Sequence, residues 1–399
     1  MELLGLPNSS FVYLMSGRLS SPLGENYMHL PMGELPHRLV GSFSKVDLHK
    51  GSEIMPKRFG YVWEEVVSQY NCEQAVLDAL RNKKKTRYLK YVRKHYKEYG
   101  TKIRNILLNG WQPKPIRLKT INEGTNQKTR NLRIPSLIDH IIHTAVSRVL
   151  QKYLLPKFYY YASGSIPKKG QLFSKNAVVH MLKSDPKYGA ECDVKKFYDN
   201  TSSDAVMNEL RRIFKDEKFL ALNEKILEQM GGHLAIGFTL SHWYAHMVLM
   251  RIDHYIKENF TDVSLTRSMD NFVMVSDSKE SLHRAIEAID TELRKRGLWL
   301  KGDWQVFPLS SRPIKFLSYR QTKGKTVMKK NLMVRISRRM RHLAPSARTA
   351  RIIVSYLGIL KHCDSHNFKC KYVYPYQNIK ESKRLISNAD RKRILLGTA

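Results

Sequence analysis

The chain has 399 residues, of which 42% are hydrophobic and 10% are aromatic. This length and composition suit two or three subdomains around a proper core and exclude a largely disordered protein. Its 69 Lys and Arg residues outnumber 35 Asp and Glu residues, which gives a formal net charge of +34. Such an excess, spread along the chain among aromatic residues, suits a nucleic-acid backbone better than a membrane surface. A purely structural nucleic-acid-binding protein would show the same charge, so charge indicates a partner and no chemistry.

Four cysteines are few and irregularly spaced, which fits a reducing cytoplasm better than a disulfide framework. The N-terminus has no basic region followed by an apolar stretch, and no apolar run reaches the roughly 18 residues of a membrane span. We therefore expect a cytoplasmic protein without membrane contact. One short segment contains the possible zinc ligands His362, Cys363, His366 and Cys370. Their spacing matches no common zinc module and the stretch continues an amphipathic helix, so zinc is not expected there.

The pattern of apolar residues changes from irregular to helical near Trp63. Residues 1–55 mix Pro, Gly and Ser with little periodicity, which predicts a loosely structured extension. From Trp63 to Asn109 apolar residues repeat at helical spacing, and a very basic stretch begins at Lys83 and Lys84. We predict that these two lysines contact a nucleic-acid backbone. The alternative is a solvated helix face.

Two short strands are predicted next, joined by a turn. Residues 116–121 alternate as a strand should, residues 124–127 favour a turn, and residues 128–135 form the second strand. Lys128 and Arg130 follow this turn and could clamp a triphosphate, because Arg donates bidentately and Lys supplies a point charge. Exposed basic turns are common, so an ordinary surface hairpin is the alternative.

From residue 137 to residue 256 the pattern is mainly helical and is interrupted by loops. A helix is predicted from Leu137 to Leu150. Residues 161–171 form a Gly, Ser and Lys loop before a helix at 177–182, without the spacing of a phosphate-binding P-loop. A short strand ends in Asp193, and a helix begins after Ser202. A glycine-bearing loop at residues 231–241 then leads into a long helix.

A second carboxylate, Asp270, lies at the tip of a predicted hairpin. The segment from Leu265 to Val275 is apolar and β-branched on both sides of a short polar pair, which is typical of two strands joined by a tight turn. Asp is also an ordinary turn residue. However, carboxylates at neighbouring strand ends, here Asp193 and Asp270, can hold two Mg²⁺ ions that clamp the attacking and leaving oxygens of a phosphoryl transfer.

The last third of the chain predicts a helix at 278–296, strands at 298–307 and 314–319, and basic helices from residue 323, including one at 347–361. Together the elements predict an α+β fold in which helices cover one face of a largely antiparallel sheet. The candidate nucleic-acid contacts of the basic helices are Arg335, Arg338, Arg339 and Arg341. A helix facing solvent is the alternative.

The order of these elements resembles a reverse transcriptase of the group II intron, retron and diversity-generating retroelement class, over roughly residues 63–361. The matching segments, in chain order, are the fingers motif at 128–136, a fingers loop at 163–167, the metal-binding palm strand at 193–199, the glycine loop at 236–241, the catalytic hairpin at 268–271, the primer-grip hairpin at 314–319 and a thumb helix at 355–362. Each segment is short, but the complete set in this order is highly specific.

The resemblance implies a right-hand polymerase fold with fingers, a palm built on an antiparallel sheet and a helical thumb. Its domains would be an N-terminal extension with basic helices at 1–110, fingers at 111–187, palm at 188–325, and a basic helical thumb and tail at 326–399. The implied activity is RNA-directed DNA polymerisation, a nucleotidyl transfer, in a mobile or diversity-generating element. No endonuclease, protease or ribonuclease H segment is recognisable.

The resemblance also implies cofactors and partners. In that family Asp193, the Val194 carbonyl and Asp270 would bind two Mg²⁺ ions, for which Mn²⁺ can substitute, and Asn271 would complete the catalytic hairpin. The residues that would contact the incoming dNTP are Lys128, Arg130, Tyr198, Ile236 and Gly237. Tyr198 would exclude the ribose 2′ hydroxyl, a core tyrosine being the alternative. Further partners would be an RNA template, a DNA primer or product, and a structured cognate RNA or an accessory protein.

The chain departs from the family pattern at four places. Ser268 replaces the usual Tyr of the hairpin, and the uncharged Asn271 replaces its second Asp, which should lower metal affinity. Ile236 replaces a Gln, a change typical of diversity-generating enzymes. Trp304 stands where a lysine is often present, and Lys301 is the nearest candidate proton donor. Two other functions therefore stay open: an RNA-binding protein with a weakened or inactive polymerase fold, and a viral-type RNA polymerase.

Overall fold

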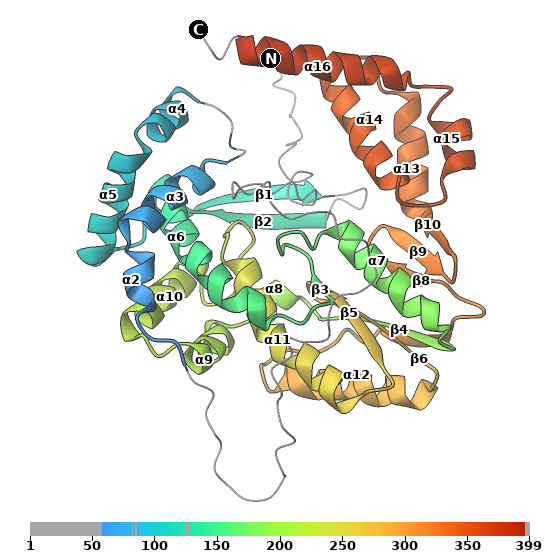
Figure 1. Cartoon of the computed structure of the whole chain (residues 1–399), viewed down its shortest axis with the longest axis horizontal. Coiled ribbons are helices and arrows are strands. Elements are labelled where there is room, and N and C mark those ends of the chain that lie inside the picture. Colours follow the sequence, from blue (N-terminus) through green and yellow to red (C-terminus); the bar gives the residue numbers. More distant parts are fainter. Residues whose placement is uncertain (1–57, 82, 84–85, 124–127, 396–399) are drawn as a thin grey trace, which may run out of the picture.

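The computed structural model of the chain describes residues 58–81, 83, 86–123 and 128–395 (Figure 1). The extension predicted at residues 1–55 and the candidate contact Lys84 lie outside the described residues. The first described helices, in blue, lie at the left of Figure 1, and the last ones, in red, lie at its upper right. In the described part of the chain, no helix is both long enough and apolar enough to cross a membrane.

In the described residues, four helices precede the first strand: α2 (Val62–Val66), α3 (Gln69–Ala79), α4 (Arg87–Lys94) and α5 (Tyr96–Leu108). α3 packs against α5 and against the long helix α6 (Leu137–Leu154), and all three contribute to the main hydrophobic core. α3 and α5 approach closely at Gly100, where a Cβ atom would lie 2.6 Å from Cγ of Glu73. α4 differs from its neighbours, because only Val92 of this helix is buried.

The predicted pair of strands forms a two-stranded antiparallel ribbon. β1 (Arg117–Glu123) and β2 (Lys128–Ile134) pair from Arg117 with Ile134 to Glu123 with Lys128. Much of β1 is exposed, including Leu118, which is 70% exposed. The far end of the ribbon is anchored, because Arg133 of β2 donates its backbone N–H to the Ile236 carbonyl at 2.9 Å.

A five-stranded sheet holds the two predicted carboxylates. Its order is β3, β5, β6, β4, β7, and all neighbours are antiparallel except the short pair β3 and β5. The strands are β3 (Ala162–Ser163), β4 (Tyr188–Asp193), β5 (Ser264–Ser268), β6 (Asn271–Ser276) and β7 (Gln305–Pro308). Of the strand predicted at residues 298–307, only the last part forms a strand, which is β7. Earlier in this segment, Leu300 makes a single β-bridge to Val194.

Helices cover both faces of this sheet, not one face as predicted. α11 (Ser241–Asn259) and α12 (Lys279–Arg294) pack on one face, and α7 (Gln171–Met181) packs on the other. In β6, Phe272 and Met274 belong to the core shared with α11 and α12, whereas Val273 and Val275 pack with α7. A strand buried on both faces has no polar side to alternate with, which explains the continuous apolar run of β6.

Three helices connect β4 to α11: α8 (Phe197–Asn200), α9 (Ser203–Ile213) and α10 (Glu217–Met230). Ser202 caps α9 as predicted and accepts a hydrogen bond from the Ala205 N–H at 3.2 Å. α10 has no counterpart among the predicted elements, although its signals are ordinary ones. Asp216 caps its start, and Gly231 ends it in the left-handed conformation with φ 90°.

The C-terminal part has a second sheet and its own core. The strands β8 (Ile314–Phe316), β9 (Tyr319–Thr322) and β10 (Lys325–Met328) are antiparallel. Residues 314–319 therefore belong to a hairpin, as the resemblance implied, and not to the one strand that the residue pattern predicted. Four helices follow: α13 (Lys330–Arg341), α14 (Ala347–Leu360), α15 (His366–Tyr372) and α16 (Ile379–Leu395). Met328, Ile336, Met340, Ile353 and Phe368 form a core separate from the others. The boundary predicted at residue 325 falls within β10.

The sequence predicted that the segment containing His362 and Cys370 continues the preceding helix. The structure instead has a break in this segment. α14 ends at Leu360, and α15 begins at His366. His366 and Cys370 are one turn apart on α15, with 3.6 Å between Nε2 and Sγ. Among the described residues, no group of three or more His, Cys, Asp or Glu side chains is arranged to hold a metal ion.

Candidate active site

Asp193 and Asp270 come together at one end of the central sheet, although 76 residues separate them. β4 pairs with β6 so that Asp193 lies opposite Asn271, and the Val194 N–H donates to the Asp270 carbonyl at 3.3 Å. Asp270 lies in the tight turn between β5 and β6, at the predicted hairpin tip. Met269, the other turn residue, is left-handed with φ 55°.

The electrostatics of this pair suit a cation. Burial, and then the negative charge of Asp193, raise the pKa of Asp270 to about 6. Within the described residues, the buried Oδ1 atom of Asp193 has no hydrogen-bond partner. A buried carboxylate oxygen without a donor and a neighbouring carboxylate of raised pKa both gain when a cation binds between them. Carboxylate and carbonyl oxygens are also the ligands that Mg²⁺ prefers, so the residues present fit a divalent metal.

Lys301 places a positive charge beside the carboxylates. Its backbone N–H donates to the Asp193 carbonyl at 2.8 Å, and its ammonium forms an ion pair with the Oδ2 atom of Asp193. Burial by itself would lower the pKa of Lys301, but the hydrogen bond and charge of Asp193 raise it above its usual value. An ammonium held beside the carboxylates can donate a proton, which is the role that the sequence predicted for this residue.

Asn271 is the first residue of β6 and is exposed. It lies across from Asp193, where its amide can offer an oxygen but no charge.

Two predicted nucleotide contacts approach the carboxylates from different elements. Tyr198 lies on α8, just beyond Lys196, which adopts the left-handed conformation with φ 43°. Burial raises the pKa of Tyr198, the charge of Asp270 raises it further, and the charge of Arg130 lowers it. The Tyr198 hydroxyl is therefore within electrostatic reach of both residues. Arg130 comes from β2, so the ribbon extends toward the site. The side chain of Lys128 is outside the described part of the chain.

The loop before α11 packs directly on the ribbon at Gly237. Gly237 has φ +115°, and a Cβ atom there would lie 2.3 Å from the Arg133 carbonyl oxygen, so only glycine fits. The adjacent Ile236 is half-buried and belongs to none of the hydrophobic cores of the described residues. This placement disfavours the interpretation of Ile236 as an ordinary core residue.

A basic groove of about 1090 Å³ lies between the β8–β10 sheet and α13. It contains three of the four predicted arginines, Arg335, Arg338 and Arg339, but Arg341 is not among its lining residues. Arg341 lies over the Tyr376 ring at 5.7 Å instead. The cations that the sequence did not single out are Lys315, Arg320, Lys329 and Lys330. They are distributed over β8, β9 and the start of α13, so no sequence run marks them.

The groove lies next to the carboxylates along β4. The Lys315 N–H donates to the side chain of Glu191, which precedes Asp193 by two residues. Side chains two residues apart on a strand share one face and are about 7 Å apart. A nucleic-acid backbone bound in the groove would therefore pass close to the candidate metal site. Lys83 is exposed and belongs to the N-terminal helical part, away from this groove.

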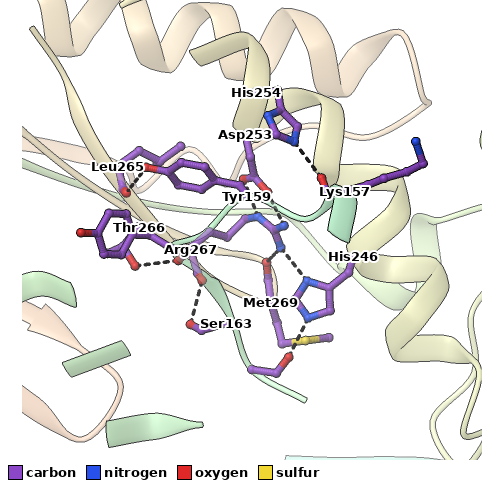
Figure 2. A network of polar contacts seen from close by, with 12 residues as sticks. Lys157, Tyr159, Ser163, His246, Asp253, His254, Leu265, Thr266, Arg267 and Met269 are labelled. Carbon is purple, nitrogen blue, oxygen red and sulfur yellow. Dashed lines mark hydrogen bonds and ion pairs between the residues drawn. The ribbon is translucent and has the colours of Figure 1, made fainter. Parts of the chain in front are cut away.

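Behind the hairpin lies a polar network that the sequence did not predict. Arg267 of β5 is fully buried and pairs with the buried Asp253 of α11 (Figure 2). A charged residue within an apolar strand is a signal in itself, because buried charges require partners. The identity of the partner depends on how α11 packs on the sheet, which spacing along the chain does not reveal.

Solved structures that resemble this chain include two telomerases. Among solved structures, the chain is similar to apo telomerase from Candida tropicalis truncated from its C-terminal domain, with 13% identity and a TM-score of 0.41, over 54% of this chain and 56% of that chain. It is also similar to telomerase from Candida albicans in complex with a fragment of telomeric RNA, with 12% identity and a TM-score of 0.42, over 63% of this chain and 53% of that chain. The chain thus spans a little over half the length of those two proteins.

No curated protein matches the chain. The reverse transcriptase (RNA-dependent DNA polymerase) family matches residues 116–321, which is more than half of the 399 residues and includes the ribbon, the five-stranded sheet and both carboxylates. The chain belongs to the reverse transcriptase family, a family of nucleotidyltransferases, and has the right-hand polymerase fold.

Proposed function

We propose that this protein is an RNA-directed DNA polymerase that extends the 3′ hydroxyl of a primer on an RNA template. The observation that carries the proposal is the meeting of Asp193 and Asp270 at the end of the sheet, with the unpartnered Oδ1 atom of Asp193 and the raised pKa of Asp270. Family membership supports the same chemistry.

Asp193, the Val194 carbonyl and Asp270 would hold two Mg²⁺ ions, or Mn²⁺ in their place. These ions would stabilise the charge that develops on the attacking and leaving oxygens. Lys301 holds a proton beside Asp193 and is the candidate donor to the leaving pyrophosphate. Arg130, together with Lys128, would orient the triphosphate of a dNTP. The basic groove that contains Arg335 would hold the backbone of the template and primer.

The test of this proposal is primer extension on an RNA template. Asp193→Ala and Asp270→Ala should abolish extension, because each removes a carboxylate that would bind metal. Asp199→Ala is the matched control, since Asp199 is an exposed carboxylate on the neighbouring helix α8. Extension by the Asp270→Ala protein at the rate of the unchanged protein would show that the metal site is assigned wrongly.

A second candidate function is an RNA-binding protein without polymerase chemistry, which Ser268 and the uncharged, exposed Asn271 favour. Extension is measured in Mg²⁺ and in Mn²⁺ against the Asp193→Ala protein. Incorporation above that control eliminates this candidate, and none above it in either metal supports it.

The choice between DNA and RNA synthesis depends on Tyr198. Its hydroxyl is within electrostatic reach of Asp270 and Arg130, and its ring would exclude a ribose 2′ hydroxyl there. Tyr198→Ala should admit ribonucleotides, which is measured as the ratio of dNTP to rNTP incorporation, with Tyr198→Phe as the control that keeps the ring. An unchanged ratio in Tyr198→Ala would remove Tyr198 from this role.

We further propose that the enzyme serves a retroelement of the group II intron, retron or diversity-generating class, and Ile236 favours an error-prone, diversity-generating type. Ile offers no donor or acceptor beside the nascent base pair, so discrimination should be lower by about one hydrogen bond, or about 1 kcal/mol. Ile236→Gln should lower the misincorporation rate, which is measured by sequencing the products. Equal rates at all four template bases would contradict the fidelity proposal alone.

The cytoplasmic location, the structured RNA and the accessory protein stay predictions.

A further inference from the structure

The guanidinium group of Arg267 donates both to the carboxylate of Asp253 and to the backbone carbonyl of Met269. Its Nε and Nη2 atoms donate to the two carboxylate oxygens of Asp253, at 2.7 and 2.5 Å (Figure 2). Both side chains are completely buried. The remaining nitrogen, Nη1, donates to the Met269 carbonyl at 2.7 Å. The buried pair therefore also contacts the turn that carries Asp270.

His246 extends this contact to a neighbouring loop. Its Nδ1 atom lies 3.4 Å from Nη1 of Arg267, and its Nε2 atom lies 2.6 Å from the Gly164 carbonyl oxygen (Figure 2). Burial, and then the charge of Arg267, hold the pKa of His246 well below its usual value, so the ring is neutral. A neutral ring satisfies both contacts when Nδ1 accepts from Arg267 and Nε2–H donates to Gly164.

The same loop also holds the turn directly. The Met269 N–H donates to the Ser163 carbonyl at 3.0 Å. Gly164 lies so close that a Cβ atom there would be 3.0 Å from the Met269 side chain and from the Ser268 hydroxyl. Both backbone polar groups of Met269 are thus held, its N–H by the neighbouring loop and its carbonyl by the side chain of Arg267 within the hairpin. Met269 needs such support, because its left-handed conformation is unfavourable for a residue with a side chain.

We propose that Arg267 is a positioning residue for the active site, which holds the Met269 carbonyl and thereby fixes the neighbouring Asp270 in its orientation toward Asp193. This inference rests on the proposed function, because it assigns Asp270 to a metal site. A buried ion pair alone is weak support for a role beyond packing, since apolar residues often replace such a pair without loss of stability. The third contact distinguishes this pair, because neighbours that orient metal-binding groups strongly affect metal affinity.

Two variants separate positioning from packing. Arg267→Lys keeps a positive charge for Asp253, but its single nitrogen cannot also reach the Met269 carbonyl. Asp253→Asn weakens the ion pair but leaves the contact between Arg267 and Met269. Thr266→Val is a further control, because it removes a buried hydroxyl that donates to the Tyr161 carbonyl at 3.0 Å and does not touch the turn. It serves in place of Asp253→Asn if that protein does not fold.

The measurement is a Mn²⁺ titration of the full chain followed by electron paramagnetic resonance, in which the sites lost in Asp193→Ala are assigned to the active site. Thermal unfolding and the kcat and KM values for dNTPs are recorded in parallel. We expect Arg267→Lys to weaken Mn²⁺ binding by about tenfold or more and to lower kcat with little change in KM. Asp253→Asn and Thr266→Val should lower the unfolding temperature but keep the Mn²⁺ affinity.

Wild-type Mn²⁺ affinity in Arg267→Lys would overturn the inference alone. So would a loss of affinity that follows the loss of stability equally in all three variants, because Arg267 would then act only through packing. If the unchanged protein binds no Mn²⁺ that depends on Asp193, the proposed function fails and the inference fails with it.

Discussion

At the scale of single residues, the raised pKa of Asp270 means that ionisation of this candidate site residue destabilises the folded protein. Its pKa in the folded protein, about 6, lies above the value near 4 of an unfolded chain. The folded state therefore binds this proton more tightly than the unfolded state does. The contribution of Asp270 to stability is greatest below pH 4 and is lost as the pH rises from about 4 to about 6.

Asp270→Asn should therefore stabilise the metal-free protein at pH 8, by roughly 1 to 3 kcal/mol, because the amide needs no ionisation in the half-buried turn. The gain should shrink toward zero at pH 4. Urea unfolding at pH 4, 6 and 8 measures both effects. Asp199→Asn is the control that removes an exposed carboxylate nearby, and an equal gain in this variant would show that general charge and not burial is responsible.

At the scale of elements, the site depends on the contact between the β1–β2 ribbon and the loop that contains Gly237. This contact involves few residues, but its geometry leaves no room for a side chain at Gly237. The Arg133 N–H donates to the Ile236 carbonyl, and the Arg133 carbonyl occupies the space that a side chain at Gly237 would need. Arg130 lies three residues earlier in β2, so this contact sets where the ribbon presents its cations.

Gly237→Ala should reduce the free energy of unfolding by roughly 2 to 4 kcal/mol, because it combines an unfavourable φ with the loss of the backbone contact. It should also raise the KM for dNTPs, because the ribbon shifts. Gly232→Ala is a matched control, since Gly232 has φ +80° and no atom lies within 4 Å of its missing Cβ atom. That variant should lose only about 1 kcal/mol. Equal losses in the two variants would show that the approach of Arg133 is unimportant.

At the scale of the whole molecule, the fold concentrates part of the net charge of +34 in one groove. The C-terminal part has its own hydrophobic core, and the groove between β8–β10 and α13 gathers cations from separate elements. The groove approaches the carboxylates through Lys315 and Glu191. A charge excess that is spread along the sequence thus becomes a localised surface beside the candidate metal site.

Binding to a template and primer should weaken steeply with salt, because bound Lys and Arg side chains release condensed counterions. Replacing Arg335, Arg338 and Arg339 together with Gln should reduce the slope of log K against log salt by about 2 to 3. Filter binding over a range of salt concentrations measures the slope. Arg341→Gln is the control outside the groove and should change it by less than one. An unaltered slope in the triple variant would mean that α13 faces solvent in the complex.

Local patterns in the sequence were sufficient for the parts of the site that short segments encode. Asp193 at the end of a strand, Asp270 at the tip of a hairpin and the Ser202 cap were all predicted, because each depends on a few neighbouring residues. The α+β fold was predictable from periodicity, and the polymerase class followed from the resemblance of the element order to reverse transcriptases. The positive charge indicated a nucleic-acid partner, although it did not place Arg341 outside the groove.

Only the tertiary structure decided which distant residues meet. Lys301 lies beside Asp193 although the two residues are 108 positions apart in the sequence. The pairing of Arg267 with Asp253 depends on how α11 packs against β5. Coverage of the sheet on both faces depends on α7, whose apolar residues do not specify the surface that they will meet. The physical reason is common to all three cases: periodicity determines which side of an element is apolar, but packing determines what lies against it and which buried charges find partners.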